Sequence, residues 1–223
     1  MLDAELKEQL KAHLSGLGHA VELVVDSSTH EQQVELLEML EGVAECSADL
    51  SVRITGEQAE LPQFAVHSDG QATGMRFVGI PGGHEFTSLV IAILNAAGKG
   101  KLPDPALAQR IRRIRAGKVR TYISQSCENC PDVVQAFNQI ALMHGRLEHT
   151  MVDGALVQAE LERLKVQGVP SVFIGDELVH SGRATLPELI ALLERRLGQD
   201  EGAGAAETDL GRFDVAVLGG GPA

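Results

Sequence analysis

The sequence predicts an α/β protein made of two successive units with the same plan, followed by a linker and the first residues of a further domain. Strand-like and helix-like segments alternate along the chain, and their order in residues 99–197 approximately repeats their order in residues 1–98. Pro62 and Pro170 stand at corresponding places in the two units. From residue 198 the composition changes to Gly, Ala, Asp and Glu, which is typical of a flexible acidic linker.

The first unit, residues 1–98, begins with leucines spaced three and four residues apart, which predicts a helix with one apolar face. We expect, in chain order, that helix, a strand at 21–25, a second helix, a strand at 52–54, two strands at 64–66 and 75–78, and a final helix over 85–97. Ser28 and Thr29 are candidate N-caps of the second helix, with Val34 expected on or near its buried side. Asp69-Gly70 is typical of the tight turn that joins two hairpin strands.

The second unit, residues 99–197, is predicted to follow the same plan with one additional helix before its paired strands. We expect, in chain order, a connecting helix capped by Asp104, a strand at 119–124, a helix over 130–143, a strand at 147–152, a helix that includes 156–164, strands at 171–174 and 178–180, and a helix over 186–197. The connecting helix carries four arginines, Arg110, Arg112, Arg113 and Arg115. They are typical of a solvated basic face, and a docking patch for an acidic partner is the alternative.

The end of the chain reads as the beginning of another domain. Residues 198–211 form the predicted linker, and residues 212–223 start with a strand pattern that runs into three glycines. This order is typical of the start of a dinucleotide-binding βαβ unit, which makes Gly219 and Gly221 candidate cofactor-binding residues. Because the unit would be cut off before its helix, we interpret the chain as a fragment of a longer protein.

Composition and charge argue against several classes of protein. The formal net charge of −12 would repel phosphate backbones and anionic membrane surfaces. With no Trp, one Tyr and six Phe, the chain has few aromatic side chains for stacking on bases. No apolar run is long enough to span a membrane, and residues 2–5 lack the basic and apolar start of a signal peptide. We therefore expect a cytoplasmic protein that binds neither nucleic acid nor membranes.

Two of the three cysteines form the run Cys-Glu-Asn-Cys-Pro at residues 127–131, between a predicted strand and a predicted helix. The N–H groups at a helix N-terminus carry partial positive charge, which favours a thiolate at Cys127. Cys130 lies about one helical turn further along, where it could attack a mixed disulfide on Cys127. The spacing therefore predicts a redox-active dithiol, a pair of cysteines that carries electrons by alternating with its disulfide.

Other uses of such a pair are weaker. A structural disulfide between cysteines this close closes a very short loop, so it removes little entropy from the unfolded chain. Such disulfides are also rare in a reducing compartment. A zinc site needs about four ligands, and His144 and His149 do not stand at zinc-finger spacing, so no metal is expected. Glu128 places a negative charge beside Cys127, which disfavours the thiolate. A less stabilised reduced form predicts a low reduction potential, that of an electron donor.

Four motifs follow one another along the chain, at residues 83–90, 127–136, 168–170 and 214–223: GHEFTSLV, CENCPDVVQA, GVP and DVAVLGGGPA. In sequence and order they resemble the N-terminal part of the AhpF family, the NADH–peroxiredoxin oxidoreductases of bacterial alkyl hydroperoxide reductase systems. The resemblance extends over essentially the whole chain. One departure is Glu128, which stands where that family usually carries a histidine.

This resemblance implies two fused thioredoxin-like units, of which only the second keeps its cysteines. It also implies that a missing C-terminal part binds FAD and NADH, carries its own dithiol and forms the contacts of a homodimer. Electrons would pass from that flavin domain to Cys127 and Cys130, and then to the disulfide of a partner peroxiredoxin, the peroxide-reducing component of an alkyl hydroperoxide reductase. The fragment itself is expected to hold no cofactor and not to use NADH unaided.

The resemblance further suggests roles for Pro170 and Glu85. In a thioredoxin-type unit, a proline in the place of Pro170 faces the dithiol with a cis peptide bond and leaves a backbone edge free for a client peptide; an ordinary turn proline is the alternative. Glu85 would lie near the dithiol, where it could tune Cys127 or move its proton. The alternative that the residues themselves favour is a carboxylate at a helix start. His84 and Cys46 are interpreted as structural residues.

An electron relay has two competitors. One is a free-standing protein disulfide oxidoreductase with many clients, which the linker and the glycine-rich end disfavour. The other is a non-catalytic module that only docks a peroxiredoxin. A Cys130→Ser variant would separate the cases, because a relay would stall as a covalent complex whereas a docking module would keep its partner without a covalent bond.

Overall fold

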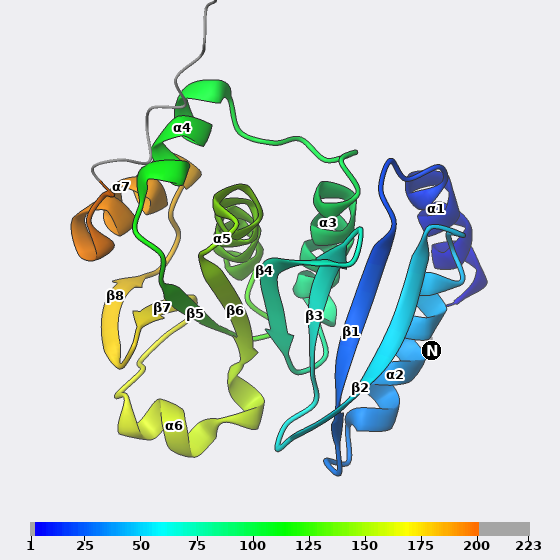
Figure 1. The fold of residues 1–223 in the computed structure, drawn as a ribbon. Coiled ribbons are helices and arrows are strands. Elements are labelled where there is room, and N and C mark those ends of the chain that lie inside the picture. Colours follow the sequence, from blue (N-terminus) through cyan, green and yellow to red (C-terminus); the bar gives the residue numbers. More distant parts are fainter. Residues whose placement is uncertain (1–2, 201–223) are drawn as a thin grey trace, which may run out of the picture.

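Eight strands form one mixed sheet in the order β2-β1-β3-β4-β6-β5-β7-β8 (Figure 1). The computed structural model describes residues 3–200. Its elements, in chain order, are α1 (Ala4–Leu14), β1 (Val21–Ser28), α2 (Gln33–Ala44), β2 (Leu50–Ala59), β3 (Gln63–Ser68), β4 (Gln71–Val78), the 3-10 helix η1 (Gly83–Glu85), α3 (Phe86–Ala96), α4 (Pro105–Arg113), β5 (Lys118–Ile123), α5 (Cys130–His144), β6 (Glu148–Asp153), the 3-10 helix η2 (Gly154–Leu156), α6 (Gln158–Arg163), β7 (Ser171–Ile174), β8 (Glu177–Ser181) and α7 (Leu186–Leu197).

The two halves of the sheet have the same strand order and the same pairing. In the first half, β2 pairs in parallel with β1, and β3 and β4 follow as antiparallel neighbours on the other side of β1. In the second half, β6, β5, β7 and β8 repeat this arrangement. β4 and β6 pair in parallel, so the two halves share one continuous sheet with aligned carboxyl ends. The predicted α/β class with a repeated plan is confirmed.

Most of the helices pack against one face of the sheet, and α6 packs against the other. Along β5, Val119 and Ile123 belong to the main hydrophobic core, whereas Tyr122 points into a smaller cluster with Leu161 and Leu164. This alternation follows from the geometry of a strand, whose successive side chains point to opposite faces. Figure 1 shows α6 set apart from α3 and α5. Within the described residues, no helix is long and apolar enough to cross a membrane.

The second helix starts later than the sequence predicts. Ser28 is the last residue of β1, which continues its pairing with β2 beyond a bulge. This extension of the strand places Ser28 and Thr29 too far from the helix to cap it. α2 begins at Gln33 without a side-chain cap, and its buried side runs through Leu36. The expected burial of Val34 is wrong, because this side chain is 64% exposed in that helical register.

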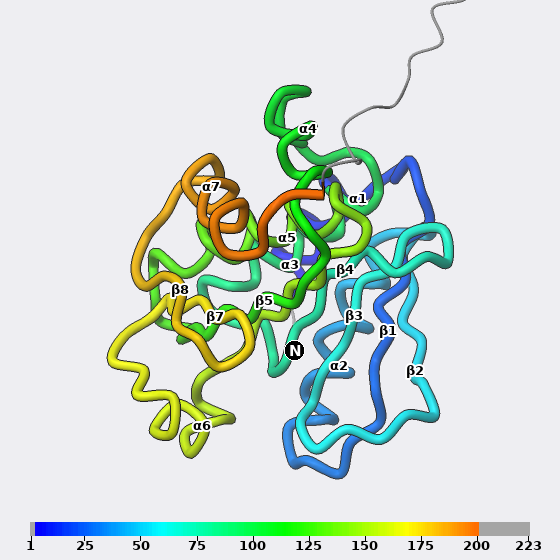
Figure 2. Tube along the Cα trace, turned by 60° about the vertical axis from the view of Figure 1, so that its left-hand side comes forward, coloured from blue at the N-terminus to red at the C-terminus, as the bar shows by residue number. Residues whose placement is uncertain are grey.

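The chain leaves α7 by turning back along the end of α4 (Figure 2). The Arg115 N–H donates to the Gly198 carbonyl at 3.1 Å, and the Asp200 N–H donates to the Arg113 carbonyl at 2.8 Å. Gly198 and Asp200, the first and third residues of the predicted linker, are therefore held by backbone hydrogen bonds. The rest of that linker and the predicted start of a further domain lie outside the described residues.

Part of the predicted basic face of α4 is used within the chain. Arg110 donates two hydrogen bonds to Glu194 of α7, at 3.0 and 2.7 Å, which joins the two helices. Arg112 and Arg113 on the same helix are exposed. As the sequence predicts, Asp104 caps α4, accepting hydrogen bonds from the N–H groups of the first turn.

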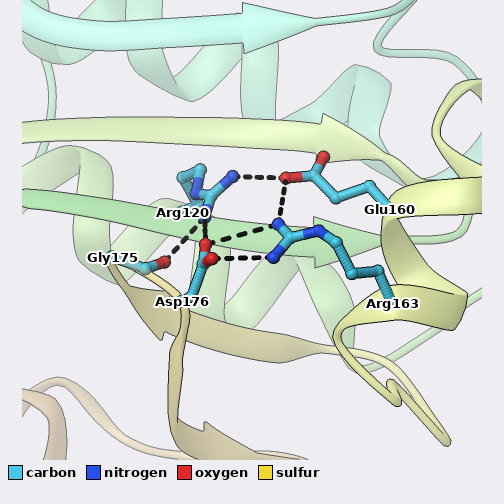
Figure 3. Close-up of polar contacts among 5 residues, drawn as sticks. All are labelled: Arg120, Glu160, Arg163, Gly175 and Asp176. Carbon is cyan, nitrogen blue, oxygen red and sulfur yellow. Dashed lines mark hydrogen bonds and ion pairs between the residues drawn. The ribbon is translucent and has the colours of Figure 1, made fainter.

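A second charged cluster joins α6 to the turn between β7 and β8 (Figure 3). Arg120 of β5 donates to Glu160 at 2.6 Å, to the Gly175 carbonyl at 2.6 Å and to Asp176 at 3.2 Å. Arg163 completes the cluster through Asp176 at 2.7 Å. Because α6 has no fully buried residue, these charge-assisted hydrogen bonds contribute to anchoring it on the sheet.

Replacing Arg120 with methionine is expected to lower the free energy of unfolding by about 1–2 kcal/mol, because a half-buried guanidinium with three partners is lost. Arg183→Met is a matched control, since the Arg183–Asp132 pair is more exposed and should contribute less than about 0.5 kcal/mol. Urea unfolding of both variants measures the difference. Equal losses in the two variants would contradict an anchoring role for Arg120.

Candidate functional site at the dithiol

Cys127 and Cys130 are joined as a disulfide at the carboxyl end of β5, where the chain turns into α5. Their Cα atoms are 5.5 Å apart. Cys130, the first residue of α5, is fully buried, whereas Cys127 is partly exposed. An incoming thiol or disulfide would therefore meet Cys127 first.

Short polar side chains build the turn in front of the dithiol. The Cys127 N–H donates to the Ser124 carbonyl at 2.9 Å, and the hydroxyl oxygens of Ser124 and Ser126 lie 3.0 Å apart. α5 then begins with Pro131 in its first turn and without a side-chain cap at Asn129. The first N–H groups of α5 consequently have no side-chain acceptor at the cap, and they would stabilise a negative charge on the sulfur of Cys127.

Pro170 lies beside this dithiol. The Val169–Pro170 peptide bond is cis, and the Val169 carbonyl oxygen is 3.8 Å from Sγ of Cys127. Directly after it, β7 starts at Ser171, whose hydroxyl donates to the Gly168 carbonyl at 2.6 Å and closes the loop. The structure thus brings the loop of Pro170 and the partly exposed cysteine together.

Glu85 ends η1, which packs against α5. The residue stands directly before α3, but its side chain makes no capping hydrogen bond and is fully buried. Neither carboxyl oxygen has a well-formed hydrogen bond among the described residues. Burial raises the pKa of Glu85 to about 7, an effect that the nearby Ser88 hydroxyl opposes. A carboxyl group of this kind can take up or release a proton near neutral pH.

Sequence reasoning gave no role to Gln125, which the structure places between η1 and the dithiol. Its side-chain amide donates to the Ile80 carbonyl at 3.2 Å and to Asp153 at 2.8 Å. The sequence offers one signal for this contact between the two halves of the chain, the glycines at 79, 82 and 83. Glycines permit a close approach of two backbones, but nothing local to them identifies the second backbone.

Two hollows, of about 540 and 500 Å³, share Gln32 and Gln125 in their linings. The first is also lined by apolar side chains of the first half, among them Met39 and Phe86. The second extends to Val169, the residue whose carbonyl lies against the dithiol. The second hollow thus reaches two neighbours of Cys127, Ser126 in the chain and Val169 across the site.

Other titratable residues noted in the sequence lie within the core. His149 is hydrogen-bonded to Thr121 at 2.9 Å and to Asn138 at 2.7 Å, and burial lowers its pKa to about 3. His144 donates to a backbone carbonyl at 2.7 Å. Cys46 is buried, and burial raises the pKa of its thiol. In the part of the chain that the structure describes, no group of three or more His, Cys, Asp or Glu side chains is arranged to hold a metal ion.

Residues 118–194 match the model of a thioredoxin domain family. Relatives in sequence include the alkyl hydroperoxide reductase AhpF of Pseudomonas aeruginosa and an NADH dehydrogenase of Bacillus subtilis, each 38% identical over the whole of this chain. The chain spans only 43% of the length of each of these relatives.

Solved structures show the same likeness. The N-terminal domain of the alkyl hydroperoxide reductase AhpF from Enterococcus faecalis superposes with a TM-score of 0.81 at 27% identity, covering 86% of this chain and all of that one. A protein disulfide oxidoreductase from Aeropyrum pernix superposes with a TM-score of 0.77 at 19% identity, covering 88% of this chain and 95% of that one. The chain therefore has a thioredoxin-like fold, as predicted.

Proposed function

This chain belongs to the AhpF family of alkyl hydroperoxide reductases, whose N-terminal region it matches, and from that premise we propose that it is a dithiol–disulfide electron relay. It would accept two electrons from a flavin-binding part of the same polypeptide and pass them to the disulfide of a peroxiredoxin. The observation that carries the proposal is the geometry of the cysteine pair. The partly exposed Cys127 stands at a helix N-terminus, and Cys130 is buried behind it.

The proposed transfer is a pair of thiol–disulfide exchanges. The Cys127 thiolate attacks one sulfur of the partner's disulfide, and the sulfur that is displaced takes up a proton. Cys130 then loses its proton and attacks Sγ of Cys127, which expels the second partner sulfur as a thiolate that is protonated in turn. The partner leaves as a dithiol with two electrons gained, and the chain is left with the Cys127–Cys130 disulfide.

Pro170 and Glu85 would support these two steps. Because the loop of Pro170 holds the Val169 carbonyl against Cys127, we propose that this stretch of backbone binds the extended segment that carries the partner's disulfide. The buried carboxylate of Glu85 would accept the proton that Cys130 releases when it attacks, and would return it when the pair is reduced again. The pKa of Glu85, raised to about 7 by burial, suits such an exchange.

The division of the chain and its cofactors are part of the same proposal. Residues 1–98 and 99–197 would be the two thioredoxin-like units. FAD, NADH and the contacts of a homodimer would belong to a C-terminal part, beginning near Gly219 and Gly221, which lie outside the described residues. The step within this chain needs no bound cofactor, because thiol–disulfide exchange itself moves the electrons.

The test is reduction of an oxidised peroxiredoxin by the pre-reduced chain, followed by counting the free thiols on the peroxiredoxin. We expect one dithiol formed for each chain oxidised, and none with Cys127→Ser. Insulin disulfides, tested in parallel, represent the clients of a general disulfide oxidoreductase. Reduction of insulin at the same rate as the peroxiredoxin would favour that alternative, and failure to reduce either substrate would refute the relay.

A further inference from the structure

The two halves meet closely at the dithiol, where the segment between β4 and η1 passes the turn between β5 and α5. Gly79 has a φ of +98°, and a Cβ at this position would come within 2.8 Å of Cβ of Asp153. Gly83 has a φ of +55°, and a Cβ there would collide with the carbonyl oxygen of Gln125. Glycine at 79 therefore lets the segment pack against the Asp153 side chain at the end of β6, and glycine at 83 lets it pack against the backbone of the β5–α5 turn.

Gln125 fastens this contact from both its side chain and its backbone. Its side-chain amide nitrogen donates to the Ile80 carbonyl in the first half, at 3.2 Å, and to the Asp153 carboxylate in the second half, at 2.8 Å. Its own backbone carbonyl accepts a hydrogen bond from the His84 N–H at 3.1 Å. These bonds hold Ile80 and His84, the two ends of the segment that leads into Glu85, against Gln125. Gln125 itself lies two residues before Cys127 in the chain.

We propose that Gln125 is a positioning residue, which holds the carboxyl group of Glu85 in place relative to the dithiol. This inference rests on the proposed role of Glu85 in the relay. Since neither oxygen of Glu85 has a well-formed hydrogen bond, the position of its carboxyl group depends on the backbone of η1. That backbone is tied to the cysteine turn through Gln125. Loss of these ties would displace the carboxyl group without removing it.

The pH dependence of the exchange rate depends on the titratable and charged groups around Glu85. η1 itself carries His84, which is exposed, and the first turn of α5 carries Cys130 and Asp132. Asp132 is paired with Arg183 at 2.8 Å. From α3, the side chain that acts on Glu85 is the uncharged hydroxyl of Ser88. The Cys127 thiol also titrates in this pH range, so an inflection is assigned to Glu85 only where Glu85→Gln removes it.

The test compares Gln125→Leu with the matched control Gln139→Leu. The side-chain amide of Gln139, on α5, also donates to the backbone carbonyl of a residue distant in sequence, Lys101, at 3.3 Å. Each pre-reduced chain reacts with the small disulfide 5,5′-dithiobis(2-nitrobenzoate) between pH 5.5 and 9, and the rate measured is that of the second thionitrobenzoate release, the step in which Cys130 attacks. In Gln125→Leu we expect a rate about tenfold lower above pH 7 and an inflection shifted or lost, because proton transfer is sensitive to small displacements. Gln139→Leu should match the unsubstituted chain.

Glu85→Gln, measured alongside, separates the two proposals. If Glu85→Gln loses the inflection while Gln125→Leu keeps the normal profile, the inference about Gln125 is overturned and the role of Glu85 stands. If Glu85→Gln keeps the normal profile, both fail. Circular dichroism verifies that each variant is folded. Should Gln125→Leu not fold, Gln125→Glu preserves the size of the side chain but places a carboxylate against Ile80 and Asp153, and the same altered profile is expected.

Discussion

Cys130→Ser is expected to stop the relay halfway and to trap it as a covalent complex with its peroxiredoxin. Cys127 can still attack the partner's disulfide, but no second sulfur is present to release it. Turnover should fall by roughly 10³-fold or more, as expected when a covalent participant is removed. The complex should appear on a non-reducing gel and in an intact mass spectrum, and it should disappear on treatment with dithiothreitol.

Two control variants make this result specific. Cys127→Ser should form no complex, because Cys130 is fully buried and cannot meet the partner. Cys46→Ser should behave as the unsubstituted chain, since the Cys46 thiol is buried in the first half and donates to backbone carbonyl oxygens. A complex that persists in Cys127→Ser, or that depends on Cys46, would rule out the proposed order of attack.

The strongest sequence signals were local ones, and the structure bears them out. The Asp69-Gly70 pair predicts the hairpin turn, and both residues have a positive φ between β3 and β4. The run from Cys127 to Pro131 predicts the strand, turn and helix around the dithiol. Thr185 and Glu188 carry a further local signal, since they form a capping box at the start of α7.

Features that depend on residues distant in sequence could not be predicted from the sequence. Ser28 has the side chain of a helix cap, but the length of β1 is decided by its pairing with β2, which lies more than twenty residues away. Val34 is apolar, as core residues are, but in the helix that begins at Gln33 its side chain is exposed to solvent. For Gln125, neither of its partners, Ile80 and Asp153, is near in sequence. These three cases share one cause, which is that tertiary pairing outweighs local propensity.

The continuous sheet explains how the segment that carries Glu85 comes to the same edge of the sheet as the dithiol. β4 and β6 pair in parallel, and β5 pairs in parallel with β6, so the carboxyl ends of all three strands lie at one edge. The chain leaves β4 at that edge for Glu85, and leaves β5 at the same edge for Cys127. The first half, which has no cysteine pair of its own, can therefore contribute a carboxyl group at the edge of the sheet where the dithiol lies.

Glu85→Gln should make the protein more stable at alkaline pH. Glu85 has an ordinary pKa of 4.5, which burial raises to about 7 in the folded chain. Between these values the folded protein binds more protons than the unfolded chain, so this contribution to stability is complete below about pH 4.5 and is lost as the pH rises through 7. Glutamine carries no charge to bury. The variant should match the unsubstituted chain near pH 4 and exceed it at pH 8 by up to about 3 kcal/mol.

Urea unfolding at pH 4 and pH 8 measures this difference, with the exposed Glu38→Gln as a control that should show none. The same Glu85→Gln substitution removes the proposed proton acceptor, so exchange with the peroxiredoxin disulfide should slow by about 10²-fold at pH 8. A variant that gains stability and keeps its rate would mean that Glu85 has no part in the relay. A variant that gains stability and loses rate would mean that the cost of burying this carboxyl group is tied to its chemistry.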